Sequence, residues 1–184
     1  MRHTRAEVIV RTIREFELLD ALVSGLSDND WQLLTPRPMA KDPWTIKDAV
    51  VHIVYWKADT ARFARGLRIR APGVRRLSSI EHNHLIWQQW RERSTQDVVA
   101  WHRSVQQDVL EALRDAPDDW FSGRERKAYW PIDLDGHSAT HRVRDIQRVL
   151  GCTRRTPAGH VLDGSGDLLG GAASKASASI HPGP

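Results

Sequence analysis

The sequence predicts an all-α fold, a four-helix bundle. Three observations favour this fold class. Apolar residues recur at spacings of three and four in several long segments, which is the pattern of amphipathic helices. No segment alternates apolar and polar residues as a half-buried strand would, and no internal repeat is present. The helical segments are joined by connections of mixed length, as in bundles where some helices that are adjacent in space are not consecutive in the chain.

Four long helices and one short helix account for the apolar pattern. Three of these helices are expected to begin at a Ser or Thr that is followed three positions later by an acidic residue. Such pairs form capping boxes, which mark the start of a helix. The pairs are Thr45 with Asp48, Ser78 with Glu81, which opens the short helix through Trp90, and Ser94 with Asp97. The expected inward faces of the first three long helices comprise Ile9, Ile13, Phe16, Leu19, Val23 and Leu26; Ala49, Ile53, Trp56, Thr60, Phe63 and Leu67; and Val98, Trp101, Val105, Val109 and Ala112.

The last helix is expected from about His137 to Leu150, and Gly151 is suited to end it. Residues 115–136 before it contain Pro and Gly and are expected to be irregular. The apolar stripe of this helix would consist of Ala139, Val143, Ile146 and Leu150.

The chain of 184 residues is long enough for one domain and a tail. Residues 1–151 form the predicted helical domain. Residues 152–184 hold six of the twelve glycines and no aromatic residue. Such a segment cannot bury enough apolar surface to offset its ordering entropy, so it is predicted to be disordered.

The composition points to the cytoplasm. No apolar run approaches the ~20 residues of a membrane span. The first residues mix charged and apolar side chains, unlike a signal peptide. The single cysteine, Cys152, excludes a disulfide within the chain, which fits a reducing compartment.

The charge is mixed rather than polybasic, with 27 Lys and Arg against 23 Asp and Glu. Residues 60–80 carry six arginines and no acid, and Pro72-Gly73 predicts that they include a loop. Such a patch could contact phosphates, but no aromatic residue interleaves with the arginines for base stacking. Nucleic acid is therefore an unlikely partner on the sequence alone.

Histidines are the main candidates for chemistry, and the chain has nine. His137 and His141 lie four residues apart on the last helix, so both imidazoles share one face and could hold one ion. That face also carries Arg144 and Asp145 and lies nearly opposite the apolar stripe. A solvated face is the competing interpretation, and periodicity alone favours it.

His52 borders the apolar face of the second long helix, as a core-boundary histidine would. As a ligand it would add a third imidazole from a different helix. Three protein ligands with an open position are what a catalytic metal needs. Asp48, one turn earlier, either caps the helix only, which we expect, or also accepts a hydrogen bond from His52.

The other candidates have no clear orientation. Glu81 and His82 are alternative ligands, His84 is expected at the edge of the core, and His102 is expected to face solvent. Eight tryptophans against two tyrosines and three phenylalanines suggest an apolar pocket, with ordinary core packing as the alternative. The candidate walls of this pocket are Trp56, Trp87, Trp90 and Trp130.

Several segments resemble the DinB superfamily. Residues 44–56 read as a tryptophan, a short polar stretch, then apolar residues around His52, as in that family's second helix. Residues 136–146 resemble its last-helix motif, H-x-x-x-H followed by an arginine and a later isoleucine. Residues 87–99 and 130–134 are similar to the ClbS/DfsB branch. The resemblance covers about residues 5–151.

The resemblance implies a four-helix bundle with a long crossover connection. It implies that His52, His137 and His141 form a metal triad at one end of the bundle, with a divalent ion such as zinc or nickel and water in the open positions. Many members of the family are thiol-dependent transferases or isomerases that use a low-molecular-weight thiol. The ClbS-like branch is linked to self-protection against a DNA-damaging, cyclopropane-bearing metabolite by hydrolysis, and its members need not keep a metal. Members often pair, so a homodimer is conceivable here.

These observations predict a divalent-metal-dependent enzyme for detoxification, acting on a small electrophilic metabolite or xenobiotic by thiol transfer or hydrolysis. An ion held by three neutral imidazoles keeps its double positive charge. It therefore lowers the pKa of a bound water or thiol, toward about 7 for zinc-bound water. The alternative is a non-catalytic protein that binds and sequesters a toxic small molecule. The sequence identifies neither the substrate nor any catalytic residue beyond the metal ligands.

Overall fold

The computed structural model consists of α-helices and describes residues 3–36, 41–65, 77–122 and 130–155. The long helices are α1 (Arg5–Ser24), α3 (Ile46–Ala64), α5 (Thr95–Asp115) and a continuous helix made of α7 (Trp130–His141), the π-helical segment η1 (Arg142–Gln147) and α8 (Arg148–Arg155). The short helices are α2 (Asp28–Trp31), α4 (Ser79–Trp90) and α6 (Asp119–Ser122). The described residues include no strand, only an isolated bridge between Leu34 and Thr45. The predicted all-α class is confirmed.

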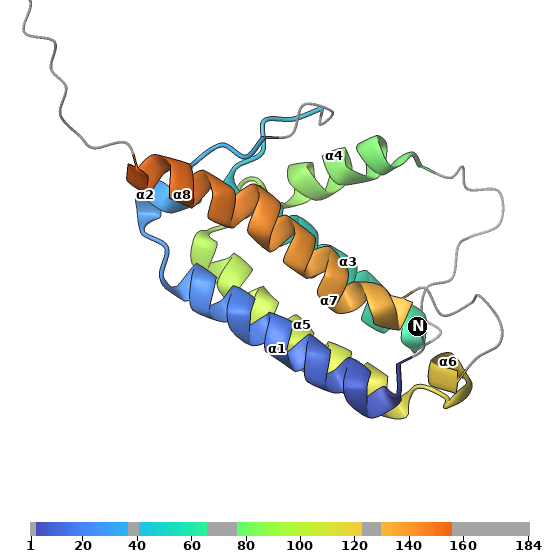
Figure 1. Ribbon diagram of the computed structural model, residues 1–184. Helices are drawn as coiled ribbons and strands as arrows, with labels where there is room; N and C mark the ends of the chain where they lie inside the picture. Colours follow the sequence, from blue (N-terminus) through green and yellow to red (C-terminus); the bar gives the residue numbers. More distant parts are fainter. Residues whose placement is uncertain (1–2, 37–40, 66–76, 123–129, 156–184) are drawn as a thin grey trace, which may run out of the picture.

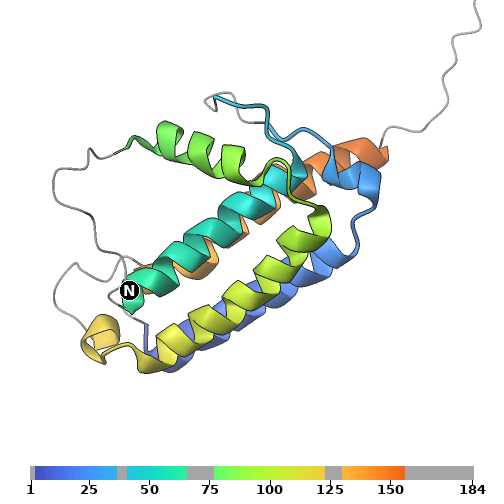
Figure 2. The same ribbon diagram turned by 180° about the vertical axis from the view of Figure 1, so that it is seen from behind.

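The long helices form a four-helix bundle (Figures 1 and 2). Both α1 and α3 pack against α5 and α7, so α1 and α3 lie diagonally opposite each other. Arg5 at the start of α1 donates to the Leu113 carbonyl near the end of α5, which makes these helices antiparallel. Lys47 at the start of α3 donates to the Arg93 carbonyl just before α5, which makes α3 and α5 parallel. Parallel neighbours require a long crossover, and here it contains α4, which packs on α3.

Capping boxes begin the helices where the sequence places them. In each box the Ser or Thr side chain accepts from a backbone N–H, and the acidic side chain accepts from the cap residue's own N–H. The three predicted boxes are confirmed, and two more open α1 and α2. The five pairs are Thr4 with Glu7, Ser27 with Asp30, Thr45 with Asp48, Ser78 with Glu81, and Ser94 with Asp97.

The apolar core is centred on α3, which is buried on more than the single predicted face. Neighbouring helices α4, α5 and α7 all pack on it, so residues on several sides lose contact with water. Its buried apolar residues are Ile46, Ala49, Val50, Val51, Ile53, Val54 and Ala61.

A polar layer crosses the bundle interior, and the sequence analysis did not predict it. The Glu15 carboxylate on α1 accepts two hydrogen bonds from the Arg142 guanidinium, at 2.9 and 2.8 Å, and one from the Ser138 hydroxyl at 3.0 Å. Further polar side chains are buried nearby with atoms that have no hydrogen-bond partner in the described part of the chain: Thr12, Lys57, His102 and Gln106.

The expectation that His102 faces solvent is wrong. Its side chain is 1% exposed and its ring stacks on Phe16, with the ring centroids 4.7 Å apart. Helix α5 lies between α1 and α3, so the positions beside its apolar stripe are also covered. Burial, and then the charge of Lys57, lowers the pKa of His102 to about 4.

The last helix differs from its predicted extent and orientation. It begins at Trp130, within the segment expected to be irregular, and it continues through Gly151 to Arg155. Val143 belongs to the predicted apolar stripe but is 52% exposed. The residues that do face the interior form two rows with a spacing of four: Leu134, Ser138, Arg142, Ile146 and Leu150 in one, and His141 and Asp145 in the other.

The π-helical segment lies where the predicted and observed faces differ. Arg142, Asp145 and Ile146 of this segment are buried. A π-turn adds a residue to the helical repeat, so a stripe predicted from the 3.6-residue period of an α-helix loses its register there.

Some predictions concern parts of the chain outside the described residues. They include the disorder of the tail beyond residue 155, the arginine-rich loop at 66–76, and the side chain of Trp130. Among the described helices, none combines the length and the apolar character that crossing a bilayer would require.

The burial of Lys57 should make the free energy of unfolding depend on pH. Burial lowers the pKa of its ammonium from 10.5 to about 8 in the folded protein, despite the nearby charges of Glu15 and Asp135. Between these two values the unfolded chain binds more protons than the folded one. The free energy of unfolding should therefore rise with pH from about 8 to 10.5, by on the order of 3 kcal/mol.

Urea unfolding between pH 7 and pH 10 measures this rise in the wild type and in Lys57→Met. We expect Lys57→Met to lose the rise. Lys47→Met is the matched control, because the Lys47 ammonium is hydrogen-bonded at the exposed surface and should leave the slope unchanged. An unchanged slope in Lys57→Met would show that Lys57 is not buried as described.

Candidate metal centre

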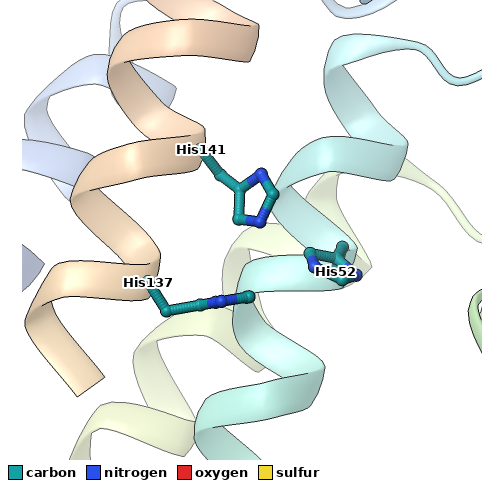
Figure 3. A group of neighbouring side chains, drawn as sticks. All are labelled: His52, His137 and His141. Atoms are coloured by element: carbon teal, nitrogen blue, oxygen red, sulfur yellow. The ribbon is translucent and has the colours of Figure 1, made fainter. Parts of the chain in front are cut away.

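The three histidines singled out in the sequence converge between α3 and α7. Figure 3 shows His52 on α3 opposite His137 and His141 on α7. One ligand nitrogen from each residue lies within 4.8 Å of the other two. The ring centroids are 4.5 Å apart for His137 and His141, 4.7 Å for His52 and His141, and 5.1 Å for His52 and His137.

The centre is closed on its core side and accessible on one flank. The exposed fractions of His52 and His141 are 5% and 7%, whereas His137 is half-buried. Periodicity alone favours a solvated face for these histidines. For His141 this interpretation is wrong, because its side chain is buried. Helix α7 packs against both α1 and α3, so its polar residues, such as Ser138, have partners inside the bundle.

Asp145 orients His141, and the sequence analysis did not identify this role. The Nδ1 atom of His141 lies 2.6 Å from a carboxylate oxygen of Asp145, which is fully buried. Because the ionised carboxylate is only an acceptor, Nδ1 carries the proton and the lone pair is left on Nε2. The other Asp145 oxygen accepts from the Arg144 guanidinium at 2.8 Å. Such carboxylate–histidine pairs support metal ligands in proteins.

His52 lies between two indole rings of α3 and the segment before it. Trp44 packs its ring 5.1 Å from that of His52, and the Trp56 N–H donates to His52 Nδ1 at 3.2 Å. Asp48 caps α3 as expected, because its carboxylate accepts from the backbone and hydroxyl of Thr45 at 2.8 Å.

The other candidate ligands have different roles. Glu81 caps α4, and His82 Nε2 lies 2.9 Å from the Tyr55 hydroxyl. His84 pairs with the Asp42 carboxylate at 2.8 Å, which agrees with its expected place at the edge of the core.

Of the four tryptophans expected to form one pocket, the three whose side chains the structure describes are separated. Trp56 contacts the histidine centre, and Trp87 lies by His84 on α4. Trp90 stacks on Trp101, with centroids 4.0 Å apart. A separate groove of about 410 Å³ lies between α3, α4 and α5, and its lining includes Tyr55, Arg62, Arg65, Gln89, Trp90 and Trp101.

The donor set is suited to a divalent cation. Three neutral imidazoles from two rigid helices can hold zinc or a similar ion and leave a coordination position open. Asp145 behind His141 and the buried side of the centre add the support and the water exclusion that such sites use. The residues present therefore fit a metal.

Comparisons with known proteins agree with this fold. The model of the DinB superfamily matches residues 11–150. The structure is similar to an uncharacterised protein from Escherichia coli UTI89, with a TM-score of 0.61 and 16% identity over 78% of this chain and 94% of that one. It is also similar to the colibactin self-resistance protein ClbS in complex with a dsDNA, with a TM-score of 0.63 and 13% identity over 83% of this chain and 98% of that one.

At these identities the two structures show the fold alone, which is the fold that the sequence resemblance implied. No curated protein matches the chain significantly. The family match spans most of the chain and includes both helices that carry the three histidines. The chain therefore belongs to the DinB superfamily.

Proposed function

We propose that this protein is a divalent-metal-dependent enzyme that acts on a small electrophilic metabolite or xenobiotic, by thiol transfer or by hydrolysis. The observation that carries the proposal is the convergence of His52, His137 and His141 within 4.8 Å. Zinc or nickel suits three imidazole ligands. Asp145 supports the assignment, because a buried carboxylate on His141 Nδ1 leaves Nε2 free of a proton.

Each residue around the centre has a separate role in the proposed reaction. A divalent ion bound there would acidify a coordinated water or low-molecular-weight thiol. Asp145 keeps the proton on His141 Nδ1 and fixes the ring. Trp44 and Trp56 cover His52 and exclude water from its side of the centre. The half-buried flank at His137 gives small molecules access.

The groove beside α3 could hold the organic part of the substrate. Its volume of about 410 Å³ falls in the range of small-molecule sites. Tyr55 lines it and precedes Trp56, which contacts His52. An apolar body would pack on Trp90 and Trp101, and an anionic group would be attracted by Arg62.

A protein that sequesters a toxic small molecule without turnover is the alternative. The structural neighbour named as a self-resistance protein favours it, although the likeness covers the fold and not the site. A cytoplasmic location and pairing into a homodimer also stay predictions from the sequence and its family resemblance.

Replacing His141 by alanine should remove the ion. We expect about one ion per chain in untagged protein, measured by mass spectrometry of metals, and loss of that ion in His52→Ala, His137→Ala and His141→Ala. Helical content by circular dichroism should be retained. His84→Ala is the control, because His84 pairs with Asp42 outside the centre. Full metal occupancy in His141→Ala would show that the ion binds elsewhere.

Asp145→Asn tests the orienting role of the carboxylate. The amide lacks the negative charge that stabilises the Nδ1 proton of His141, so zinc affinity should fall by about 10–100-fold. Competition with a chromogenic chelator measures this change. Asp108→Asn is the matched control, because Asp108 pairs with Arg65 at the exposed surface. Equal affinities in the wild type and Asp145→Asn would leave Asp145 a structural role only.

Binding to double-stranded DNA is a second candidate function. The neighbouring structure of ClbS contains dsDNA, which weakens the sequence-based expectation that nucleic acid is not a partner. If the chain binds DNA through its arginines, fluorescence anisotropy should give an affinity that falls steeply between 50 and 200 mM salt, by about 10³-fold or more for six phosphate contacts. Absence of binding at the lowest salt would exclude this function.

A further inference from the structure

The hydrogen bond between Trp56 and His52 constrains how the centre can bind a metal. Trp56 follows His52 by four residues on α3, so the two rings share one face of the helix. The indole Nε1–H donates to His52 Nδ1 at 3.2 Å. An indole N–H is only a donor, so Nδ1 accepts with its lone pair and the ring proton of neutral His52 is on Nε2.

Neither nitrogen of His52 can bind a cation while this hydrogen bond persists. If Nδ1 is the ligand, the metal needs the lone pair that the indole N–H already occupies. If Nε2 is the ligand, its proton must move to Nδ1, which then becomes a donor and can no longer accept from Trp56. Neutral imidazole has one lone pair in the ring plane available to either partner. The two interactions are mutually exclusive in both cases.

We propose that Trp56 competes with the metal for His52, so that loading of the centre breaks the Trp56–His52 hydrogen bond and releases the indole. This inference rests on the proposed metal site and adds a positioning residue to it. His141 differs, because its Nδ1 already donates to Asp145 and its Nε2 is ready to ligate. His141 is therefore already oriented as a ligand. His52 becomes a ligand only when its hydrogen bond from Trp56 breaks, and binding through Nε2 also requires its proton to move to Nδ1.

Release of the indole would also change the contacts of side chains outside the centre. The Trp56 ring lies 5.1 Å from the ring of His82, and His82 is hydrogen-bonded to the Tyr55 hydroxyl. Tyr55 lines the groove between α3, α4 and α5. Metal loading and the shape of this groove are thus linked through one chain of contacting side chains.

Zinc titration of protein labelled with ¹⁵N at the indole nitrogens tests the proposal without an activity assay. The indole signal of Trp56, identified by its absence in Trp56→Phe, should shift by more than any other as zinc binds. The Trp87→Phe variant supplies a comparison signal, because Trp87 stacks on His84 away from the centre. Stoichiometric zinc binding with an unmoved Trp56 signal would overturn the proposal.

The affinity of Trp56→Phe for zinc gives a second, independent readout. Phenylalanine keeps an aromatic ring but has no N–H to compete, so the zinc Kd should tighten by about twofold to tenfold, the equivalent of one hydrogen bond of ordinary net strength. Trp87→Phe should bind as the wild type does. A weaker Kd in Trp56→Phe, with helical content retained, would contradict competition. Failure of the wild type to bind zinc or nickel at all would instead overturn the proposed function itself.

Discussion

The buried ion pair between Glu15 and Arg142 determines how the last helix, made of α7, η1 and α8, faces the rest of the bundle. Both charged groups lie inside the bundle and share two hydrogen bonds, and the Ser138 hydroxyl donates to the same carboxylate. Loss of one partner would leave an unpaired charge in the interior, which costs about 3–5 kcal/mol. A rotation of α7 that separated Arg142 from Glu15 would carry His137 and His141 away from His52. The ion pair thereby couples the packing of α7 on α1 to the geometry of the histidine centre.

The π-helical segment that follows His141 gives the centre its support. It carries Asp145, which contacts His141, and Arg142, which contacts Glu15, and both side chains are buried. Interruptions of this type often occur at functional sites. The same helix thus supplies two ligands, the carboxylate that orients one of them, and the cation that anchors it to α1.

The sequence predicted the elements whose signals are local. The Thr45–Asp48 capping box begins α3, and His52 and the pair His137 and His141 meet as the family resemblance implied. It did not predict the orientation of the last helix. A polar helix face is interpreted as solvent-exposed when the residues that pair with it are distant in the sequence. Arg142 is buried through Glu15, which lies 127 residues away in sequence. The spacing of His141 and Asp145 was the one local sign of the supporting carboxylate.

The central claim is that three imidazoles from α3 and α7 hold one divalent ion. X-ray absorption spectroscopy of the zinc-loaded protein measures the ligand set directly. The account predicts three imidazole nitrogens at about 2.0–2.1 Å, with the remaining position filled by oxygen or another light atom. In protein prepared without any added thiol, a sulfur ligand at about 2.3 Å, or a sphere with fewer than three imidazoles, would contradict it.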